Sequence, residues 1–307
     1  MNYTSATETD THPMDNFPVR RLAFDFDNVQ LKDPLWSRSS RQFSMFINAL
    51  GVHVPHFERY LVKTMLEAKE KVSNEKLKHD MAAITGQEAQ HAKNFLHCNK
   101  WLAKRYPKIA KLDDGARTFF DSHIKSDSLK RKVGYTAGYE TFTFLAGLIV
   151  LENYDHWMKD SDPVMKALWV WHQVEEVEHG AVAFEVYKDL YGDDEWYRKW
   201  MVLSALVHIA SETIKCYTTM TVVEGYWRNP LRGIKEMGFC GYLLVRFLIS
   251  ALPVFKRNYH PRSHKLVTGK KTAIQIAWRR YEKAGGDVLS INHDKMSEIL
   301  GVAKPTS

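Results

Sequence analysis

One stretch of the sequence carries metal-binding residue types at helical spacing. In the segment 171–184 (WHQVEEVEHGAVAF), His172, Glu176 and His179 follow one another at intervals of four and three residues. At about 3.6 residues per turn, these three side chains project from one stripe of a helix, which forms one wall of a metal site. Glu175 lies on the edge of the same stripe, so the sequence leaves open which of the two neighbouring carboxylates points inward.

A second Glu-x-x-His motif, formed by Glu88 and His91, lies inside another long helical stretch. Each motif has a glutamate in the preceding helix at a comparable distance: Glu58 precedes Glu88, and Glu140 precedes Glu176. The midpoint of each pair falls at or close to a predicted turn. Folding each helical hairpin at its turn therefore brings each glutamate level with its Glu-x-x-His partner.

One glutamate from each of two helices and one Glu-x-x-His motif from each of two others form the ligand set of a four-helix bundle that holds two metal ions. A buried cluster of carboxylates requires cations to neutralise it, and carboxylates combined with imidazoles suit iron or manganese. The sequence predicts a dimetal centre whose ligands are Glu58, Glu88, His91, Glu140, His172, Glu176 and His179.

Two of these positions have alternatives. Glu152 competes with Glu140, because the geometry of the hairpin suits both, but the apolar neighbours of Glu140 favour Glu140. His172 is a seventh ligand, a residue that orients a carboxylate ligand, or a core histidine between Trp169 and Trp171. We prefer direct ligation, which would distinguish this site from a dimetal centre with six protein ligands.

Apolar periodicity, helix caps and helix breakers indicate the elements that position these residues. We expect short irregular helix between Pro107 and Leu129, and strand signals are nearly absent. The sequence therefore predicts an all-α fold, a four-helix bundle with additional N-terminal and C-terminal helices. The expected helices span residues 35–51, 55–72, 75–106, 130–158, 163–191, 196–227 and 237–255.

The same patterns predict the domain organisation. Residues 1–18 are polar and are expected to form a disordered tail, and residues 19–192 hold the dimetal bundle. Residues 193–285 are expected to supply C-terminal helices that pack on the bundle within the same domain. Residues 286–307 are expected to form a C-terminal tail.

Composition limits the location and the partners of the chain. The 307 residues include three cysteines without a C-x-x-C pair, and the N-terminal residues lack a secretory pattern, so we expect a cytoplasmic protein. The net charge of +7 is interpreted as a solvated basic surface, with no nucleic acid as partner. The apolar stretch 237–255 contains Arg246 and Pro253, which favour a core or interfacial helix over a transmembrane span.

Three quoted segments together carry a family resemblance: NALGVHVPHFERYLVKTM, ITGQEAQHAKNF and WHQVEEVEHGAVAFEVY. The sequence resembles, over roughly residues 20 to 265, a bacterial ferritin-like family of predicted metal-dependent hydrolases. The resemblance implies a ferritin-like four-helix bundle and the seven metal ligands named above. The His-x-x-x-Glu-x-x-His pattern is also similar to that of di-iron N-oxygenases such as p-aminobenzoate N-oxygenase.

Three functions follow from these observations. We favour a di-iron oxidase or oxygenase that uses two iron ions, dioxygen as co-substrate and an external electron donor to oxidise an apolar or amphipathic, lipid-like organic substrate. The alternatives are a dimetal-dependent hydrolase and a non-catalytic iron-binding helical protein. Mn/Fe and zinc are alternative metal contents, and a peripheral membrane contact and a homodimer are left open.

Overall fold

The computed structural model describes residues 14–27, 33–192, 194–267 and 273–302. In these residues the regular structure is helical, apart from one isolated antiparallel bridge between Ser37 and Ser161. The all-α prediction is therefore confirmed.

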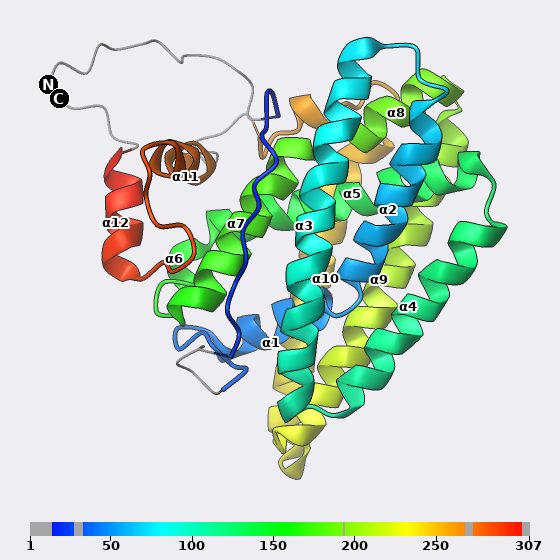
Figure 1. The fold of residues 1–307 in the computed structure, drawn as a ribbon. Helices are drawn as coiled ribbons and strands as arrows, with labels where there is room; N and C mark the ends of the chain where they lie inside the picture. The colour runs from blue at the N-terminus through cyan, green and yellow to red at the C-terminus, as the bar shows by residue number, and fades with distance from the viewer. Residues whose placement is uncertain (1–13, 28–32, 193, 268–272, 303–307) are drawn as a thin grey trace, which may run out of the picture.

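Four helices run side by side through the middle of the molecule (Figure 1). Helix α2 packs against α3 and α5, and α7 packs against α5 and α3. The core between them is filled by large apolar side chains that are almost completely buried. The bounds of the four helices are α2 Val54–Lys69, α3 Glu75–Arg105, α5 Leu129–Glu152 and α7 Pro163–His179.

Polar caps at the predicted turns fix where these helices begin. The side chain of Asn74 accepts a hydrogen bond from the backbone N–H of Leu77 at the start of α3. The side chain of Asp162 accepts from the backbone N–H groups of Val164 and Met165, and Pro163 occupies the first turn of α7. Such caps satisfy backbone donors that have no partner within the helix.

Five helix predictions need correction. The helix expected over 130–158 ends at Glu152, with the separate short helix α6 (Tyr154–Trp157) after it, and the helix expected over 237–255 is α10, which spans Pro230–Ala251. Residues 108–126 form one continuous helix, α4 (Lys108–Ser126), instead of short irregular helix. The predicted helix over 163–191 is broken after His179, and its second half is α8 (Val182–Tyr191). A Cβ at Gly180 would lie 2.7 Å from the ring of Phe144, so close packing at the break requires glycine. The first helix, α1 (Arg41–Gly51), begins after its cap Ser40 and not at residue 35.

Both predicted tails also contain packed residues. Met14 and Phe17 are buried, whereas residues 1–13 of the predicted N-terminal tail lie outside the described residues. The predicted C-terminal tail contains helix α12 (His293–Val302), which packs on α11 (Ala273–Lys283) through buried side chains such as Ile299. Apolar residues in these segments contribute to the core. The mostly polar composition of both ends gave no indication of this packing.

The remaining helices complete the core. Helix α9 (Glu195–Val223) lies along α5 and α1, and α10 (Pro230–Ala251) packs on α9 and α5. Among the described residues, one helical stretch, 230–255, is long and apolar enough to cross a membrane, and 28% of its most apolar window is buried. The short elements are α6 Tyr154–Trp157, η1 Tyr226–Arg228, η2 Leu252–Phe255 and η3 Pro261–Ser263.

Candidate metal site

The four central helices bring all seven predicted ligand residues together. Helix α2 supplies one of them, α3 two, α5 one and α7 three. Each of these side chains belongs to a residue that is at most 4% exposed. Their donor atoms form two adjacent sets, one of Glu58, His91, His172 and Glu176, and one of Glu88, Glu140, Glu176 and His179.

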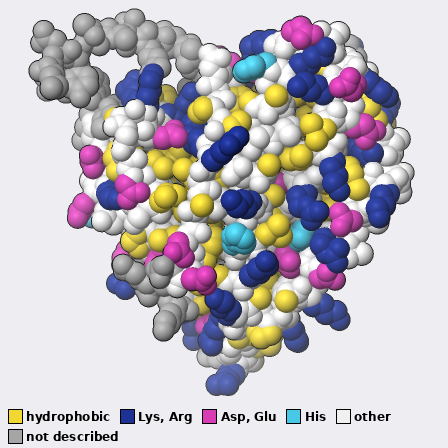
Figure 2. All heavy atoms as spheres, viewed as in Figure 1, with side chains coloured by type: hydrophobic (Ala, Val, Ile, Leu, Met, Phe, Trp, Pro, Cys, Tyr) yellow, Lys and Arg dark blue, Asp and Glu magenta, His cyan; other side chains and the backbone are white. Residues whose placement is uncertain are grey.

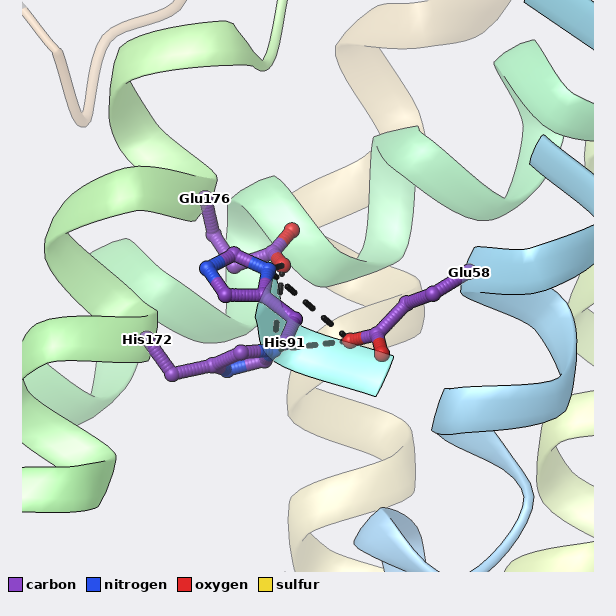
Figure 3. Close-up of side chains that lie close together, drawn as sticks. All are labelled: Glu58, His91, His172 and Glu176. Atoms are coloured by element: carbon purple, nitrogen blue, oxygen red, sulfur yellow. Dashed lines mark hydrogen bonds and ion pairs between the residues drawn. The ribbon is translucent and has the colours of Figure 1, made fainter. Parts of the chain in front are cut away.

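The first set surrounds a point between α2, α3 and α7 (Figure 3). Nε2 of His172 lies 3.3 Å from Glu58 Oε1 and 3.1 Å from Glu176 Oε1. Nδ1 of His91 lies 3.9 Å from the same oxygen of Glu58 and 3.6 Å from the same oxygen of Glu176. Two imidazole nitrogens and two carboxylate oxygens therefore converge.

The second set lies one turn further along α7. Nε2 of His179 is 3.0 Å from Glu88 Oε1, 3.4 Å from Glu140 Oε2 and 3.4 Å from Glu176 Oε2. Three carboxylates and one imidazole face one another here, so this set is richer in oxygen donors than the first.

Glu88 and Glu176 each connect the two sets. Glu176 directs Oε1 toward His172 and Oε2 toward His179. Glu88 directs Oε2 toward His91, at 3.6 Å, and Oε1 toward His179. Each carboxylate therefore has one oxygen for each set, which is the arrangement in which a carboxylate bridges two neighbouring cations.

Several donor atoms are buried without a hydrogen-bond partner. Glu58 Oε2, both carboxylate oxygens of Glu88 and Glu140 Oε2 are in this state, as is Nδ1 of His91. These Glu88 and Glu140 oxygens have only the ion-pair contacts with histidines given above, so Glu58 Oε2 is the most isolated of them. Leaving a buried carboxylate oxygen unpaired costs several times the free energy of an ordinary hydrogen bond. Metal cations would satisfy these atoms, so the residues fit a dimetal centre.

The carboxyl groups differ in their affinity for protons. Burial raises the pKa of Glu140 well above its usual value and also raises that of Glu58. Burial acts in the same direction on Glu176, but His172 and His179 outweigh it and hold the pKa of Glu176 well below its usual value. Glu140 is therefore the weaker acid of the two and Glu176 the stronger, so proton release on metal binding is expected to come from Glu140 more than from Glu176.

The outer nitrogen of each histidine has a partner of its own. His91 Nε2 lies 2.8 Å from Glu175 Oε2, and His179 Nδ1 lies 2.9 Å from Gln87 Oε1. His172 Nδ1 lies 3.2 Å from the amide nitrogen of the neighbouring Gln173. Such partners fix the orientation and tautomer of a metal-binding imidazole. Glu175 thus faces the outer edge of His91, and the inward carboxylate is Glu176.

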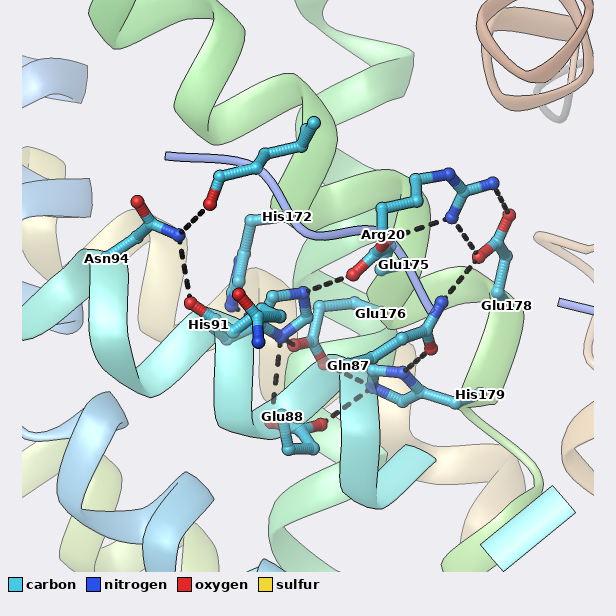
Figure 4. A network of polar contacts seen from close by, with 12 residues as sticks. Arg20, Gln87, Glu88, His91, Asn94, His172, Glu175, Glu176, Glu178 and His179 are labelled. Carbon is cyan, nitrogen blue, oxygen red and sulfur yellow. Dashed lines mark hydrogen bonds and ion pairs between the residues drawn. The ribbon is translucent and has the colours of Figure 1, made fainter. Parts of the chain in front are cut away.

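Arg20 joins the hydrogen-bond partners of His91 to those of His179 (Figure 4). Its Nη1 donates to Glu175 Oε1 at 2.9 Å and to Glu178 Oε2 at 2.7 Å, and its Nη2 donates to Glu178 Oε1 at 2.9 Å. Glu178 Oε2 also accepts a hydrogen bond of 2.9 Å from Gln87, the residue that contacts His179. The Arg20 guanidinium therefore takes part in two hydrogen-bond networks. One leads through Glu175 to His91, and the other leads through Glu178 and Gln87 to His179.

The sequence analysis did not identify Arg20, Gln87 or Glu178. Arg20 lies outside any helix, so helical periodicity gives no signal for its position. A weak sequence signal for a buried cation is the run EEVE at 175–178, because three glutamates so close together in a largely apolar helix cannot all face one metal site.

The rival ligand Glu152 lies away from both sets. It is the last residue of α5, and its Oε2 is 3.4 Å from Nη2 of Arg246. Glu140, three turns earlier on the same helix, is the α5 residue that joins a donor set.

A small cavity adjoins His172. Its volume is about 30 Å³, and α9 and α10 contribute Ile209 and Phe247 to its wall. His53 also lines this cavity, and neither of its ring nitrogens has a hydrogen-bond partner. Burial, assisted by His208, holds the pKa of His53 well below its usual value, so its imidazole is neutral.

Comparison with known proteins gives one match. A family model described as predicted metal-dependent hydrolase matches residues 18–265. Searches of curated proteins and of solved structures each returned no match. Because the family match covers well over half of the 307 residues, the chain belongs to the family of predicted metal-dependent hydrolases.

Proposed function

We propose that α2, α3, α5 and α7 form a ferritin-like bundle that holds two metal ions, and that the chain uses these ions as a metal-dependent hydrolase. The observation that carries this proposal is the pair of shared carboxylates, Glu88 and Glu176, whose oxygens divide between the two donor sets. The family description supports hydrolysis, which the sequence analysis ranked second to oxygen chemistry.

The residues of the chain have separable tasks in such a reaction. The first donor set would hold one ion and the second set the other, with Glu176 common to both. Two bound ions would polarise a carbonyl or phosphoryl oxygen and lower the pKa of a water molecule. Glu175 and Gln87 would keep His91 and His179 in the orientation that presents a nitrogen to each ion.

His53 is our candidate for the group that accepts a proton from the attacking water. It is neutral and unpartnered, and it lines the same cavity as His172. A general base needs a free nitrogen lone pair and a pKa near the working pH. His53 has the free lone pair, and opening of the cavity to water and substrate would relieve the burial that lowers its pKa in the closed state. This proposal supplies the general base that could not be identified from the sequence.

The remaining cavity wall indicates the substrate class. Phe142, Trp169 and Phe247 line it, and Thr143 and Gln173 add a few polar groups. A mostly apolar wall with few polar groups suits an apolar or amphipathic organic molecule. The cavity has room for about one water molecule, so α9 or α10 must move before a larger group can reach His172.

A second candidate function is oxidation by two iron ions and dioxygen, with an external electron donor. The observation that favours it is the composition of the donor sets, which combine four glutamates with three histidines. Oxygen-rich sets of this kind suit iron and manganese better than zinc.

Metal loading tests both candidates. The purified chain is stripped with a chelator and reloaded separately with Zn²⁺, Mn²⁺ or Fe²⁺, and each form is assayed with nitrophenyl esters and phosphodiesters and for dioxygen consumption. The hydrolase proposal expects cleavage that requires metal and proceeds without dioxygen. His53→Gln should lower kcat about 100-fold, whereas His97→Gln, at an exposed position of α3, should leave it unchanged.

Two results would contradict the hydrolase proposal, and they can be told apart. Dioxygen consumption by the Fe²⁺ form without any hydrolytic activity would support the oxidase or oxygenase instead. Metal binding without either reaction would support a non-catalytic iron-binding protein.

A further inference from the structure

Exposed large apolar side chains gather on α9 and α10. Trp196 is 81% exposed, Val207 68% and Leu231 79%. Most of the exposed large apolar residues in the described part of the chain lie between Trp196 and Leu252. We call this surface the α9–α10 apolar face and define it by Trp196, Trp200 and Val207 of α9 and Leu231, Ile234 and Ile249 of α10.

The face consists of two helical stripes that lie on neighbouring helices. On α9, Trp196, Trp200, Leu203 and Val207 recur at intervals of three or four residues, so they share one side of the helix. Hydrogen bonds join α9 to α10 and to the short helix η2 that follows it. Tyr217 donates to the backbone of Glu236 in α10, and Arg198 donates to the backbone of Val254 in η2. Large exposed apolar surfaces of this kind mark sites of protein or membrane contact.

Within the segment 196–257 the exposed charges have one sign, and the acidic Asp194 and Glu152 beside the face are held in ion pairs with Lys130 and Arg246. Between residues 196 and 257, all of which are described, the exposed charged residues are Lys215, Arg228, Arg232, Lys235, Lys256 and Arg257. The acidic residues of the same range are shielded, as in the ion pair of 2.6 Å between Glu212 and Lys215. On the face drawn in Figure 2, acidic and basic side chains are instead interspersed.

We infer that the α9–α10 apolar face docks on a membrane surface rich in anionic phospholipid. Apolar and aromatic side chains enter the boundary between headgroups and acyl chains, and the surrounding lysines and arginines attract anionic headgroups. A second copy of the chain suits the surface less well, because two identical faces would bring charges of the same sign together.

Helix α10 does not span the membrane in this arrangement. The inner side of α10 is committed to the protein core, where Cys240, Leu243 and Phe247 are at most 3% exposed. Arg246, in the middle of α10, lies over the ring of Trp157 at 5.7 Å and pairs with Glu152. Only the outer side is available, so the helix would lie in the interface plane.

Vesicle flotation of the full chain tests the inference. The probes are vesicles that mix phosphatidylglycerol with phosphatidylcholine, and vesicles of phosphatidylcholine alone. We expect binding to the anionic vesicles that weakens as salt is added, because salt screens the attraction. Arg232→Glu with Lys235→Glu should reduce the partition coefficient by about tenfold or more. The matched control, Lys93→Glu with Lys100→Glu on α3, should leave it nearly unchanged.

The apolar contribution needs its own variants. Leu231→Asp with Ile249→Asp should abolish flotation, whereas Leu66→Asp, at a 56% exposed position of α2, should not. Unchanged helical circular dichroism and thermal midpoints show that these exposed changes leave the fold intact. Absence of wild-type flotation overturns the inference, and so does equal binding by the wild type and by Leu231→Asp/Ile249→Asp. A lipid-independent dimer that the double aspartate variant dissociates, without vesicle binding, assigns the face to a second copy and likewise overturns it.

Discussion

Oε2 of Glu175 lies 2.8 Å from Nε2 of His91, on the edge of the ring that faces away from the donor sets. The other ring nitrogen, Nδ1, points toward Glu58, Glu88 and Glu176. A carboxylate in this position orients the imidazole and makes its inner nitrogen a stronger base. Two neighbouring glutamates therefore have different tasks: Glu176 faces the donor sets, and Glu175 supports one of their histidines.

Glu175→Gln tests this division. Glutamine keeps the size of the side chain but removes its charge, so we expect metal affinity to fall about 10- to 100-fold without loss of either site. Competition with a chromogenic chelator measures the affinity. Glu70→Gln, at the exposed residue that directly follows α2, is the control. Unchanged affinity in Glu175→Gln, or complete loss of metal, would contradict the supporting role.

Arg20→Gln should destabilise the fold, because it removes the cation that contacts both Glu175 and Glu178. Arg20 is 5% exposed, and both glutamates are fully buried. Removing one partner of a buried ion pair typically costs about 3 to 5 kcal/mol. Denaturant unfolding of the metal-free chain measures this free energy. The neighbouring Arg21 is exposed, so Arg21→Gln should change it by less than about 0.5 kcal/mol; equal effects of the two substitutions would contradict the network.

His208 should make stability depend on pH below neutrality. Burial lowers its pKa to about 4, and its Nδ1 contacts the hydroxyl of Tyr139. The unfolded chain, with a histidine pKa near 6.5, binds the proton first as pH falls, so stability is lost between about pH 6.5 and pH 4. Allowing for the half-buried position of His208, its share of that loss at pH 5 is about 1 to 2 kcal/mol.

Unfolding of His208→Asn at pH 7 and pH 5 measures this contribution. The difference in unfolding free energy between the two pH values should be smaller in the variant than in the wild type. His97→Asn is the exposed control and should keep the wild-type difference. A variant with the full wild-type pH dependence would exclude His208 as its source.

Metal removal should lower the thermal midpoint, because four buried glutamates then lose their counter-charges. A ligand present at 100 times its dissociation constant stabilises the folded state by about 2.7 kcal/mol. For a chain of this size, that corresponds to a shift of about 4 °C. Thermal unfolding before and after chelation measures the shift, with Glu152→Gln as a control that should retain it. A midpoint that is indifferent to metal would argue against a metal site in the core.

Helical spacing, together with the predicted turns, indicated which side chains come together at the two donor sets. His172, Glu176 and His179 share a stripe of α7 because helical geometry requires it, and the caps Asn74 and Asp162 mark the turns that align the hairpins. The choice between Glu140 and Glu152 rested on the apolar neighbours of Glu140, and the structure places Glu140 with the donor sets.

The residues that surround the donor sets, such as Arg20, could not be predicted from helical spacing. Arg20 and Glu282 are joined by a hydrogen bond of 2.7 Å although nearly the whole chain separates them. Contacts between distant segments have no periodic signature, because they depend on how the chain ends pack on α7. At the break after His179, Gly180 packs closely against Phe144 of α5, another contact between distant segments that local periodicity does not record.

The number of metal ions per chain tests the central claim most directly. Elemental analysis of the reloaded protein should give two ions per wild-type chain, and Glu176→Ala should lose at least one of them, because Glu176 belongs to both donor sets. Glu152→Ala should keep both ions, since Glu152 lies beside Arg246. A wild-type chain without bound metal, or a Glu176→Ala chain that keeps both ions while Glu175→Ala loses them, would contradict the account.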